Sequence, residues 1–254
     1  MIILTQIKAV LVALVLFAFV LMPTCLVAIF LPLRRRLLVV CPVWRFVSDK
    51  TLKWACAANI DISEDHRSES LKNDLPAKGL YIANHQSYID IPLIITKFQV
   101  PPIMKKEVLY IPIIGLVGWA SGALIVSRGK NDSRRRVFEQ TKNRVLKEKI
   151  GIQVYPEGTR SKLAHPKPDS EIKKTLIYFA YENKIPVIPV SMYGTRGVLT
   201  KMGTIRPKRH LGIIVHQEIH PDRFATREEF AKFCWDKVVV GYEQMRTKLR
   251  PLNN

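Results

Sequence analysis

The chain has 254 residues, of which 48% are hydrophobic, and this composition excludes an intrinsically disordered protein. Lysine and arginine total 40 against 21 acidic residues, giving a formal net charge of +19. Such an excess indicates attraction to a polyanion: nucleic acid, an anionic membrane surface or a phosphate-bearing substrate. The four cysteines are scattered along the chain without a regular spacing and form no Cys-x-x-Cys motif. This distribution argues against a disulfide scaffold and against a cysteine-based zinc site.

The first predicted element is an uncharged, hydrophobic segment from Ala9 to Leu33. It exceeds the roughly 20 residues that a helix needs to cross a bilayer. A cleaved signal peptide is the alternative, but the segment is longer than a signal-peptide core and is followed by Arg34–Arg36 rather than by an Ala-x-Ala site. We therefore expect a retained membrane anchor in the inner or cytoplasmic membrane, with the arginines holding its C-terminal side in the cytoplasm. Pro23 leaves two forms open, a spanning helix and a re-entrant two-helix motif.

The second predicted element is an amphipathic helix from Val40 to Ala58, with Trp44 and Trp54 on its apolar side. Its composition suits the headgroup layer of a membrane and also the core of a soluble domain, and both interpretations stay open. A polar stretch, Ser63–Ser70, then reads as a linker. We therefore divide the chain into an N-terminal membrane region, residues 1–62, and a main domain, residues 63–254.

Short strand-like segments recur along the main domain and alternate with two helical stretches, Ser133–Lys149 and Ile172–Asn183. The predicted strands are Gly79–Ala83, Ala123–Val126, Ile152–Tyr155, Ile185–Val190 and Gly212–Val215. This alternation predicts an α/β fold with a mostly parallel central sheet flanked by helices.

Candidate catalytic residues follow the first of these strands, in the segment Asn84–Asp90. Residues five apart are offset by about 140° on a helix, so His85 and Asp90 can meet only if His85 ends the strand and a helix begins beyond it. Ser87 is a suitable N-cap, and it would turn the Asp90 carboxylate back toward the strand end. The carboxylate would then hold Nδ1–H of the imidazole and leave Nε2 free as a base. A capping box beside a structural histidine is the alternative interpretation.

A second candidate site is the segment Gln153–Ser161, where a strand breaks into a turn containing Pro, Gly and hydroxyl residues. Backbone N–H groups of this turn, together with Thr159 and Arg160, are suited to hold a phosphate, although an ordinary polar turn has the same composition. Arg128 follows another predicted strand and by itself indicates little. The two prolines of Ile185–Val190 indicate architecture rather than chemistry.

Together these segments resemble the glycerolipid acyltransferase family, which includes the 1-acylglycerol-3-phosphate acyltransferases. The family pattern is Asn-His-x-x-x-x-Asp, Gly-x-x-Phe/Ile-Ile/Val-x-Arg, Phe-Pro-Glu-Gly-Thr-Arg-Ser and Val-Pro-Ile/Val-x-Pro-Val. This sequence has NHQSYID at 84–90, GALIVSR at 122–128, YPEGTRS at 155–161 and IPVIPV at 185–190. Tyr155 replaces the usual Phe, and Ile172–Thr175 lacks the glycine that many relatives carry there, so acceptor or acyl-chain preference can differ from the family's best-known activity.

The resemblance implies a membrane-bound O-acyltransferase that moves a fatty acyl group from acyl-CoA or acyl carrier protein to the sn-2 hydroxyl of 1-acylglycerol-3-phosphate. The product would be phosphatidic acid, an intermediate of phospholipid biosynthesis. His85 would be the general base and Asp90 would orient it. The implied substrate-binding residues are Arg128, Glu157, Gly158, Thr159 and Arg160, with Lys105 assisting. A thioester is already activated, so no metal and no cofactor beyond the donor substrate is expected.

Several alternatives stay open on the sequence alone. The expected partners are a lysophospholipid acceptor, the acyl donor and anionic membrane lipids, but not nucleic acid. Acylation of another lysolipid is the alternative within the class, and a non-catalytic basic module that binds anionic lipid is the alternative outside it. A metal site at His216 and His220 is disfavoured, because residues four apart on a strand lie about 13 Å from each other.

Overall fold

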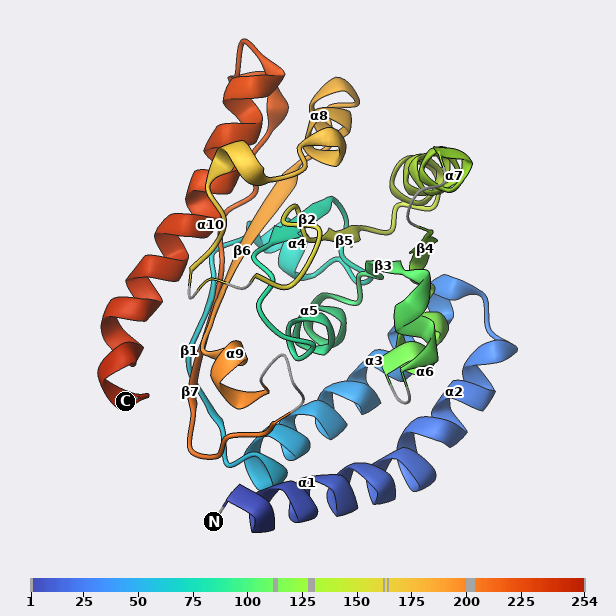
Figure 1. Ribbon diagram of the computed structural model, residues 1–254. Coiled ribbons are helices and arrows are strands. Elements are labelled where there is room, and N and C mark those ends of the chain that lie inside the picture. Colours follow the sequence, from blue (N-terminus) through green and yellow to red (C-terminus); the bar gives the residue numbers. More distant parts are fainter. Residues whose placement is uncertain are drawn as a thin grey trace.

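The computed structural model describes residues 2–111, 114–127, 131–161, 163, 165–199 and 204–253. A helical N-terminal region precedes a part of the chain in which strands and helices alternate (Figure 1). The helices are α1 (Ile2–Leu16), α2 (Met22–Ile29), α3 (Leu33–Lys50), α4 (Glu69–Lys72), α5 (Asp90–Phe98), α6 (Ile114–Ala120), α7 (Asn131–Lys142), α8 (Thr175–Glu182), α9 (Thr195–Val198) and α10 (Arg227–Leu249). The strands are β1 (Asn59–Asp65), β2 (Leu80–Ala83), β3 (Ile103–Lys105), β4 (Leu124–Val126), β5 (Ile152–Val154), β6 (Val187–Tyr193) and β7 (His210–Val215).

The main sheet has the strand order β1-β7-β6-β2-β5, and β3 and β4 form a two-stranded parallel sheet beside it. A parallel bridge between Pro102 and Gln153 joins the start of β3 to β5, so the two sheets form one continuous layer. Strand β2 runs parallel to both β5 and β6, whereas β6 and β7 are antiparallel. The predicted α/β fold with a mostly parallel sheet flanked by helices is confirmed.

Both faces of the central strands are buried, as expected for short, continuously apolar runs in a parallel sheet. Leu80 and Ile82 of β2 belong to a core cluster shared with α8 and α10. Tyr81 of β2 belongs to a second cluster, which contains Ile94 and Phe98 of α5. Side chains alternate across a strand, so successive residues of β2 serve opposite layers. Figure 1 shows α8 and α10 on one side of the strands and α5 on the other.

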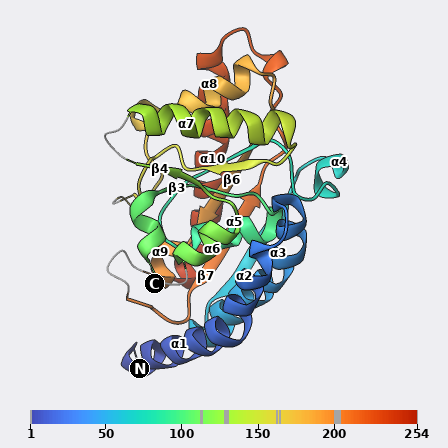
Figure 2. The ribbon, with the colours of Figure 1, turned by 90° about the vertical axis from the view of Figure 1, so that its right-hand side faces the viewer.

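The N-terminal helices form an antiparallel pair. α1, a π-helical turn (Phe17–Leu21) and α2 continue one another, and α3 returns beside α2. Figures 1 and 2 show this pair beyond α5 and α6 at one end of the molecule. Trp44 Nε1 donates to Thr24 Oγ1 at 3.3 Å between the two helices. The stretch Val10–Ala28 is long and apolar enough to cross a membrane, by length and composition.

The two sides of this helix pair differ in character. Residues of α2 and α3 form one core cluster with Ile91 and Ile95 of α5. The predicted amphipathic helix therefore packs on α5 through Val40, Trp44 and Val47, which supports its interpretation as a core helix. The opposite side exposes large hydrophobic residues: Leu4, Ile7, Val10, Leu11, Leu14, Val15, Phe19, Met22, Leu26, Val27, Phe30, Leu38, Val39 and Phe46.

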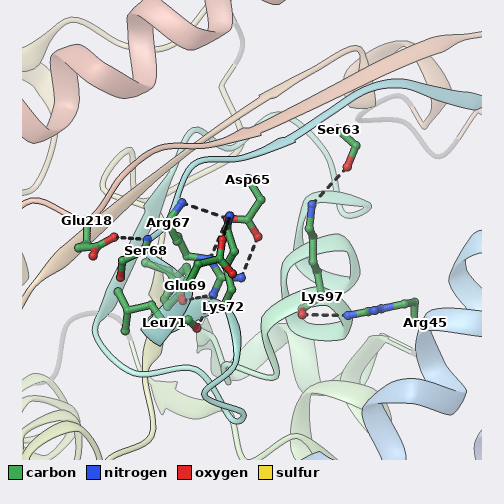
Figure 3. A network of polar contacts seen from close by, with 11 residues as sticks. Arg45, Ser63, Asp65, Arg67, Ser68, Glu69, Leu71, Lys72, Lys97 and Glu218 are labelled. Atoms are coloured by element: carbon green, nitrogen blue, oxygen red, sulfur yellow. Dashed lines mark hydrogen bonds and ion pairs between the residues drawn. The ribbon is translucent and has the colours of Figure 1, made fainter.

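The predicted linker Ser63–Ser70 is ordered structure in part. Its first three residues complete β1, which pairs with β7, and Glu69 begins α4. The Arg67 guanidinium is buried: Nε and Nη2 donate to the Asp65 carboxylate at 2.9 and 2.8 Å (Figure 3). Its Nη1 donates to the hydroxyl of Tyr81 at 3.0 Å. The expected domain boundary after residue 62 falls within β1, and the division into two domains stays a prediction.

Other predicted bounds shift by a few residues. The helix expected over Ser133–Lys149 is α7, which begins at Asn131, followed by a π-helical turn that ends at Lys147. The helix expected over Ile172–Asn183 is the shorter α8. Strand β6 extends past Val190 to Tyr193, because its last residues pair with β7.

Candidate active site

The chain reverses its direction across the sheet between the neighbouring strands β2 and β5. From β2 the chain passes through α5 to β3 on one side, and from β5 it passes through α8 to β6 on the other. In α/β sheets the crevice at such a reversal, outside the carboxyl ends of the strands, is where ligands bind. The segments Asn84–Asp90 and Tyr155–Ser161 follow these two strands, so the topology brings both candidate sites to this edge.

The side chains of His85 and Asp90 are in contact. His85 Nδ1 lies 2.9 Å from Asp90 Oδ2, and the Asp90 side chain is fully buried whereas 12% of the His85 side chain is exposed. An ionised carboxylate only accepts hydrogen bonds, so Nδ1 carries the proton and Nε2 keeps its lone pair. The contact is the one expected from the sequence, and the roles of base and orienting group stay a prediction.

The backbone around Asp90 fixes its carboxylate. Oδ2 also accepts the backbone N–H groups of Gln86 and Ser87, each at 2.7 Å. Asp90 is the first residue of α5, where the positive end of the helix dipole favours a negative charge. The expected N-cap role of Ser87 is not seen, because α5 begins at Asp90 and Ser87 Oγ instead donates to the carbonyl of Leu199 at 3.0 Å.

The turn after β5 holds the backbone of His85 from both sides. The His85 N–H donates to Glu157 Oε1 at 2.9 Å, and the Ser161 N–H donates to the His85 carbonyl at 2.7 Å. The ring of Tyr155 stacks on the imidazole, with 4.1 Å between ring centroids and 24° between planes. Gln153 Nε2 donates to the Tyr155 hydroxyl. The two candidate sites of the sequence thus form one structural unit around His85.

Glu157 is buried within this unit. The pKa of its carboxyl is raised to about 7, mainly by burial and also by the Asp90 carboxylate, against the opposing effect of the donated His85 N–H. Its Oε2 atom is buried without a hydrogen-bond partner among the residues that the structure describes. Because its Oε1 atom accepts the His85 N–H, Glu157 acts on this histidine's backbone.

Cationic groups line the outer side of the turn. Gly158 has φ +67°, and a Cβ there would lie 3.2 Å from the ammonium nitrogen of Lys173. The Arg160 guanidinium carbon lies 3.7 Å from the ring centroid of Tyr88, which belongs to the loop that carries His85. Thr159, between them, is exposed. The turn therefore presents a hydroxyl and two cations beside the histidine, a suitable arrangement for an anionic group.

Of the two further predicted residues, Lys105 lies at the same edge. Lys105 ends β3, where it pairs with Val126 of β4. The chain therefore leaves β3 after Lys105 on the side of the candidate site, because β3 runs parallel to β5 through the Pro102–Gln153 bridge. Arg128, expected to assist in substrate binding, lies outside the described residues.

Comparison with known proteins decides the family. The family model described as Acyltransferase matches residues 63–193, more than half of the chain. The matched segment runs through β6 and contains His85, Asp90 and the Tyr155–Ser161 turn. The chain belongs to the acyltransferase family.

Curated relatives of this acyltransferase carry the name 1-acyl-sn-glycerol-3-phosphate acyltransferase. One from Cocos nucifera is 28% identical over 152 residues, which cover 59% of this chain and 46% of the relative. One from Escherichia coli is 30% identical over 146 residues, which cover 56% of each protein. The chain thus spans about half the length of the curated relatives it matches.

A solved structure supports the fold of this acyltransferase. It is described as the 1-acyl-sn-glycerophosphate (LPA) acyltransferase PlsC from Thermotoga maritima. The TM-score is 0.73 at 24% sequence identity, and the alignment covers 96% of both chains. The likeness includes the N-terminal helices as well as the sheet.

The structure places residues in the candidate site that sequence reasoning did not select. Asn84 pairs with the backbone of Met192 through two hydrogen bonds, at 2.8 and 2.9 Å, and so fastens the loop to β6. Tyr155 stacks on His85, and Lys173 reaches the turn at Gly158. Tyr155 and Asn84 stand inside the quoted motifs, and Lys173 stands in the segment Ile172–Thr175 that was compared with the family pattern, so all three had a usable signal in the sequence.

Proposed function

We propose that this acyltransferase moves a fatty acyl group from a thioester to the sn-2 hydroxyl of 1-acylglycerol-3-phosphate. The observation that carries the proposal is the 2.9 Å contact between His85 Nδ1 and Asp90 Oδ2, at the edge of the sheet where ligands bind in this class of fold. The acceptor substrate is proposed from the names of the curated relatives, which are 1-acyl-sn-glycerol-3-phosphate acyltransferases. The donor is acyl-CoA or an acylated carrier protein, both of which are thioesters.

The proposed reaction uses His85 twice. As the acceptor oxygen attacks the thioester carbonyl, Nε2 takes the hydroxyl proton, and Asp90 stabilises the resulting imidazolium. The tetrahedral intermediate then collapses, the carbon–sulfur bond breaks, and the imidazolium returns its proton to the departing thiolate. An ester and a free thiol result, with no change of oxidation state.

The phosphate of the acceptor is proposed to bind at the outer side of the turn, on Thr159, Arg160 and Lys173. Gly158 has a positive φ, a conformation that favours glycine, and without a side chain at this position the phosphate can approach the backbone of the turn. Arg128 and Lys105 are proposed to assist from the neighbouring strand ends. Glu157 is proposed to position His85 rather than to touch the phosphate, since its Oε1 accepts the His85 N–H and its carboxyl is buried.

Membrane attachment is proposed for the exposed side of the N-terminal helix pair. Phe19 and Phe30 expose 78% and 86% of their surface, and an apolar surface of this extent along Val10–Ala28 suits hydrocarbon rather than water. Arg34–Arg36 follow within the first turn of α3. By the distribution of basic residues, the catalytic domain is proposed to lie on the cytoplasmic side.

The decisive experiment is an acceptor panel with the purified full chain in detergent micelles. Labelled palmitoyl-CoA or palmitoyl-acyl carrier protein is offered with lysophosphatidic acid, lysophosphatidylcholine or lysophosphatidylglycerol, and products are identified by mass. We expect phosphatidic acid as the dominant product. Transfer only to another lysolipid would replace the acceptor, and failure of every acceptor with both donor types would favour a non-catalytic lipid-binding module.

A further inference from the structure

A cavity of about 510 Å³ lies beside the C-terminal end of α10. It is lined by Glu243, Arg246, Thr247, Arg250 and Pro251. None of these residues belongs to the motifs discussed above. Two arginines around one polar cavity suggest a binding site for an anion.

This end of α10 lies at the same edge of the sheet as His85. Tyr193, the last residue of β6, packs edge-on against Tyr242 of α10, with ring centroids 5.4 Å apart. Gly212, which pairs with Tyr193, closely approaches Met245 of α10. Figure 1 shows the C-terminal end of α10 beside β1 and β7. The cavity therefore lies near the carboxyl end of β6, and the candidate active site lies at the carboxyl end of its neighbour β2.

A short chain of side chains separates the two sites. Gln86, the neighbour of His85, donates from Nε2 to the hydroxyl of Tyr242 at 3.2 Å. Tyr242 immediately precedes Glu243, the first residue of the cavity wall. A group bound in the cavity is thus close to the reaction centre but not in contact with it, and needs a linker to reach His85.

The cavity wall carries two cations, Arg246 and Arg250, and one carboxylate, Glu243. Glu243 Oε2 accepts from Arg246 Nη1 at 2.9 Å, which orients that guanidinium and uses one of its five N–H groups. Burial raises the pKa of Tyr193, at the end of β6, while the positive charges of Arg246 and Arg250 lower it. Both guanidinium charges therefore reach the same region of the sheet edge.

We propose that this cavity binds the phosphate groups of the nucleotide end of an acyl-coenzyme A donor. The proposal rests on the acyl transfer proposed above. In the acceptor, only a few bonds separate the phosphate from the reacting hydroxyl, so that phosphate must bind beside His85. In the donor, the pantetheine arm separates the phosphates from the thioester, so they must bind at a distance along the same edge. The cavity meets this second requirement.

The first test measures binding without turnover. The His85→Ala variant of the full chain, in detergent micelles, is titrated with coenzyme A and with adenosine 3′,5′-bisphosphate by calorimetry. Replacing both Arg246 and Arg250 with Gln should weaken binding of both probes by about 10- to 100-fold, because hydrogen bonds to charged groups are lost. The matched control is Lys248→Gln, on the same helix and exposed but outside the cavity. Equal binding by the double variant and the control would overturn the proposal.

The second test is kinetic and separates the sources of phosphate. With active protein, the double variant should raise KM for palmitoyl-CoA by a similar factor and leave KM for palmitoyl-pantetheine, which lacks phosphate, unchanged. A raised KM for lysophosphatidic acid instead would assign the cavity to a lipid headgroup and overturn the donor assignment. If no donor supports turnover, the proposed function fails, whereas the binding test still decides what the cavity holds.

Discussion

The Tyr155 ring stacks on His85. The effect of this ring on kcat can be measured separately from the effect of the Tyr155 hydroxyl. Aromatic pairs stabilise by about 0.5–1.5 kcal/mol beyond the area that they bury. Replacing Tyr155 with Leu removes the stack and should lower kcat by about 2- to 10-fold. Tyr155→Phe is the matched control, because it keeps the ring and loses only the hydrogen bond from Gln153. Equal losses in both variants would shift the role from the ring to the hydroxyl.

Arg160 is the cation that the proposed function uses most directly. Its replacement by Gln should raise KM for lysophosphatidic acid by about 10- to 100-fold, the loss expected for a hydrogen bond to a charged group. The acceptor phosphate is bound before the transition state, so kcat should change little. Arg227→Gln is the control, since Arg227 pairs with Glu182 at the far end of α10. A fall in kcat at unchanged KM would contradict the phosphate role.

Glu157 gives the stability of the protein a pH dependence. Burial raises its pKa from 4.5 to about 7 in the folded protein, so between these values the folded chain holds a proton that the unfolded chain has released. Raising the pH through this window therefore lowers the free energy of unfolding. Gln cannot lose a proton, so Glu157→Gln should gain stability over the wild type from pH 4.5 to pH 7, by about 3 kcal/mol.

Chemical denaturation of both proteins at pH 5 and pH 8 measures this change. Glu171→Gln, at an exposed position, should show no such trend with pH. The free energies of unfolding of the wild type and of Glu157→Gln are compared at each pH. A difference between them that stays constant from pH 5 to pH 8 would contradict a raised pKa at Glu157.

Among the elements, the N-terminal helix pair has the most directly testable surface. Phe19 and Leu26 expose 78% and 53% of their surface within the stretch Val10–Ala28. Replacing both with Asp places charge where the hydrocarbon is expected, at about 2.5–3.5 kcal/mol for each residue. The double variant should lose co-sedimentation with lipid vesicles while its main domain stays folded. The control Phe233→Asp changes a 42% exposed residue of α10, and equal binding by all three proteins would contradict the proposed membrane face.

Strand β2 and the loop after it were predictable because their signals are local. A buried parallel strand reads as an apolar run, and Leu80–Ala83 is fully buried. The His85–Asp90 contact follows from a strand that ends in a turn before a helix, all within a few residues. The wrong detail, Ser87 as the N-cap, arose because helix bounds are the least certain part of such a prediction.

Other features depend on partners that are distant in the sequence. Ser63–Asp65 reads as a linker because β1 is an edge strand whose residues are largely exposed. Arg67 belongs to the same polar stretch, yet it is buried because Asp65 and Tyr81 both accept from it. The His85 contact with Glu157 requires β2 and β5 to be neighbouring strands. Local sequence patterns do not predict which strands are neighbours.

In the whole molecule, the edge of the sheet that carries His85 also meets the apolar helices. Val12 of α1 packs against the cluster that contains Leu52 and Val198, as does Ile89, which directly precedes α5. A lipid acceptor held in the bilayer by its acyl chain would therefore enter beside the helix pair. The Tyr155–Ser161 turn and the α10 cavity lie along this edge, so the two proposed substrates would both reach His85 from it.

The central claim is that His85 acts as the base, and one matched pair of variants tests it. His210 forms the same contact with Asp61, Nδ1 to Oδ2 at 2.9 Å, but at the start of β7 rather than at the candidate active site. The measurement is the kcat of acyl transfer from palmitoyl-CoA to lysophosphatidic acid by His85→Ala and His210→Ala in vesicles. We predict a loss of about 10²- to 10⁴-fold for His85→Ala and activity near that of the wild type for His210→Ala. A His85→Ala protein within a few-fold of the wild type would contradict the account.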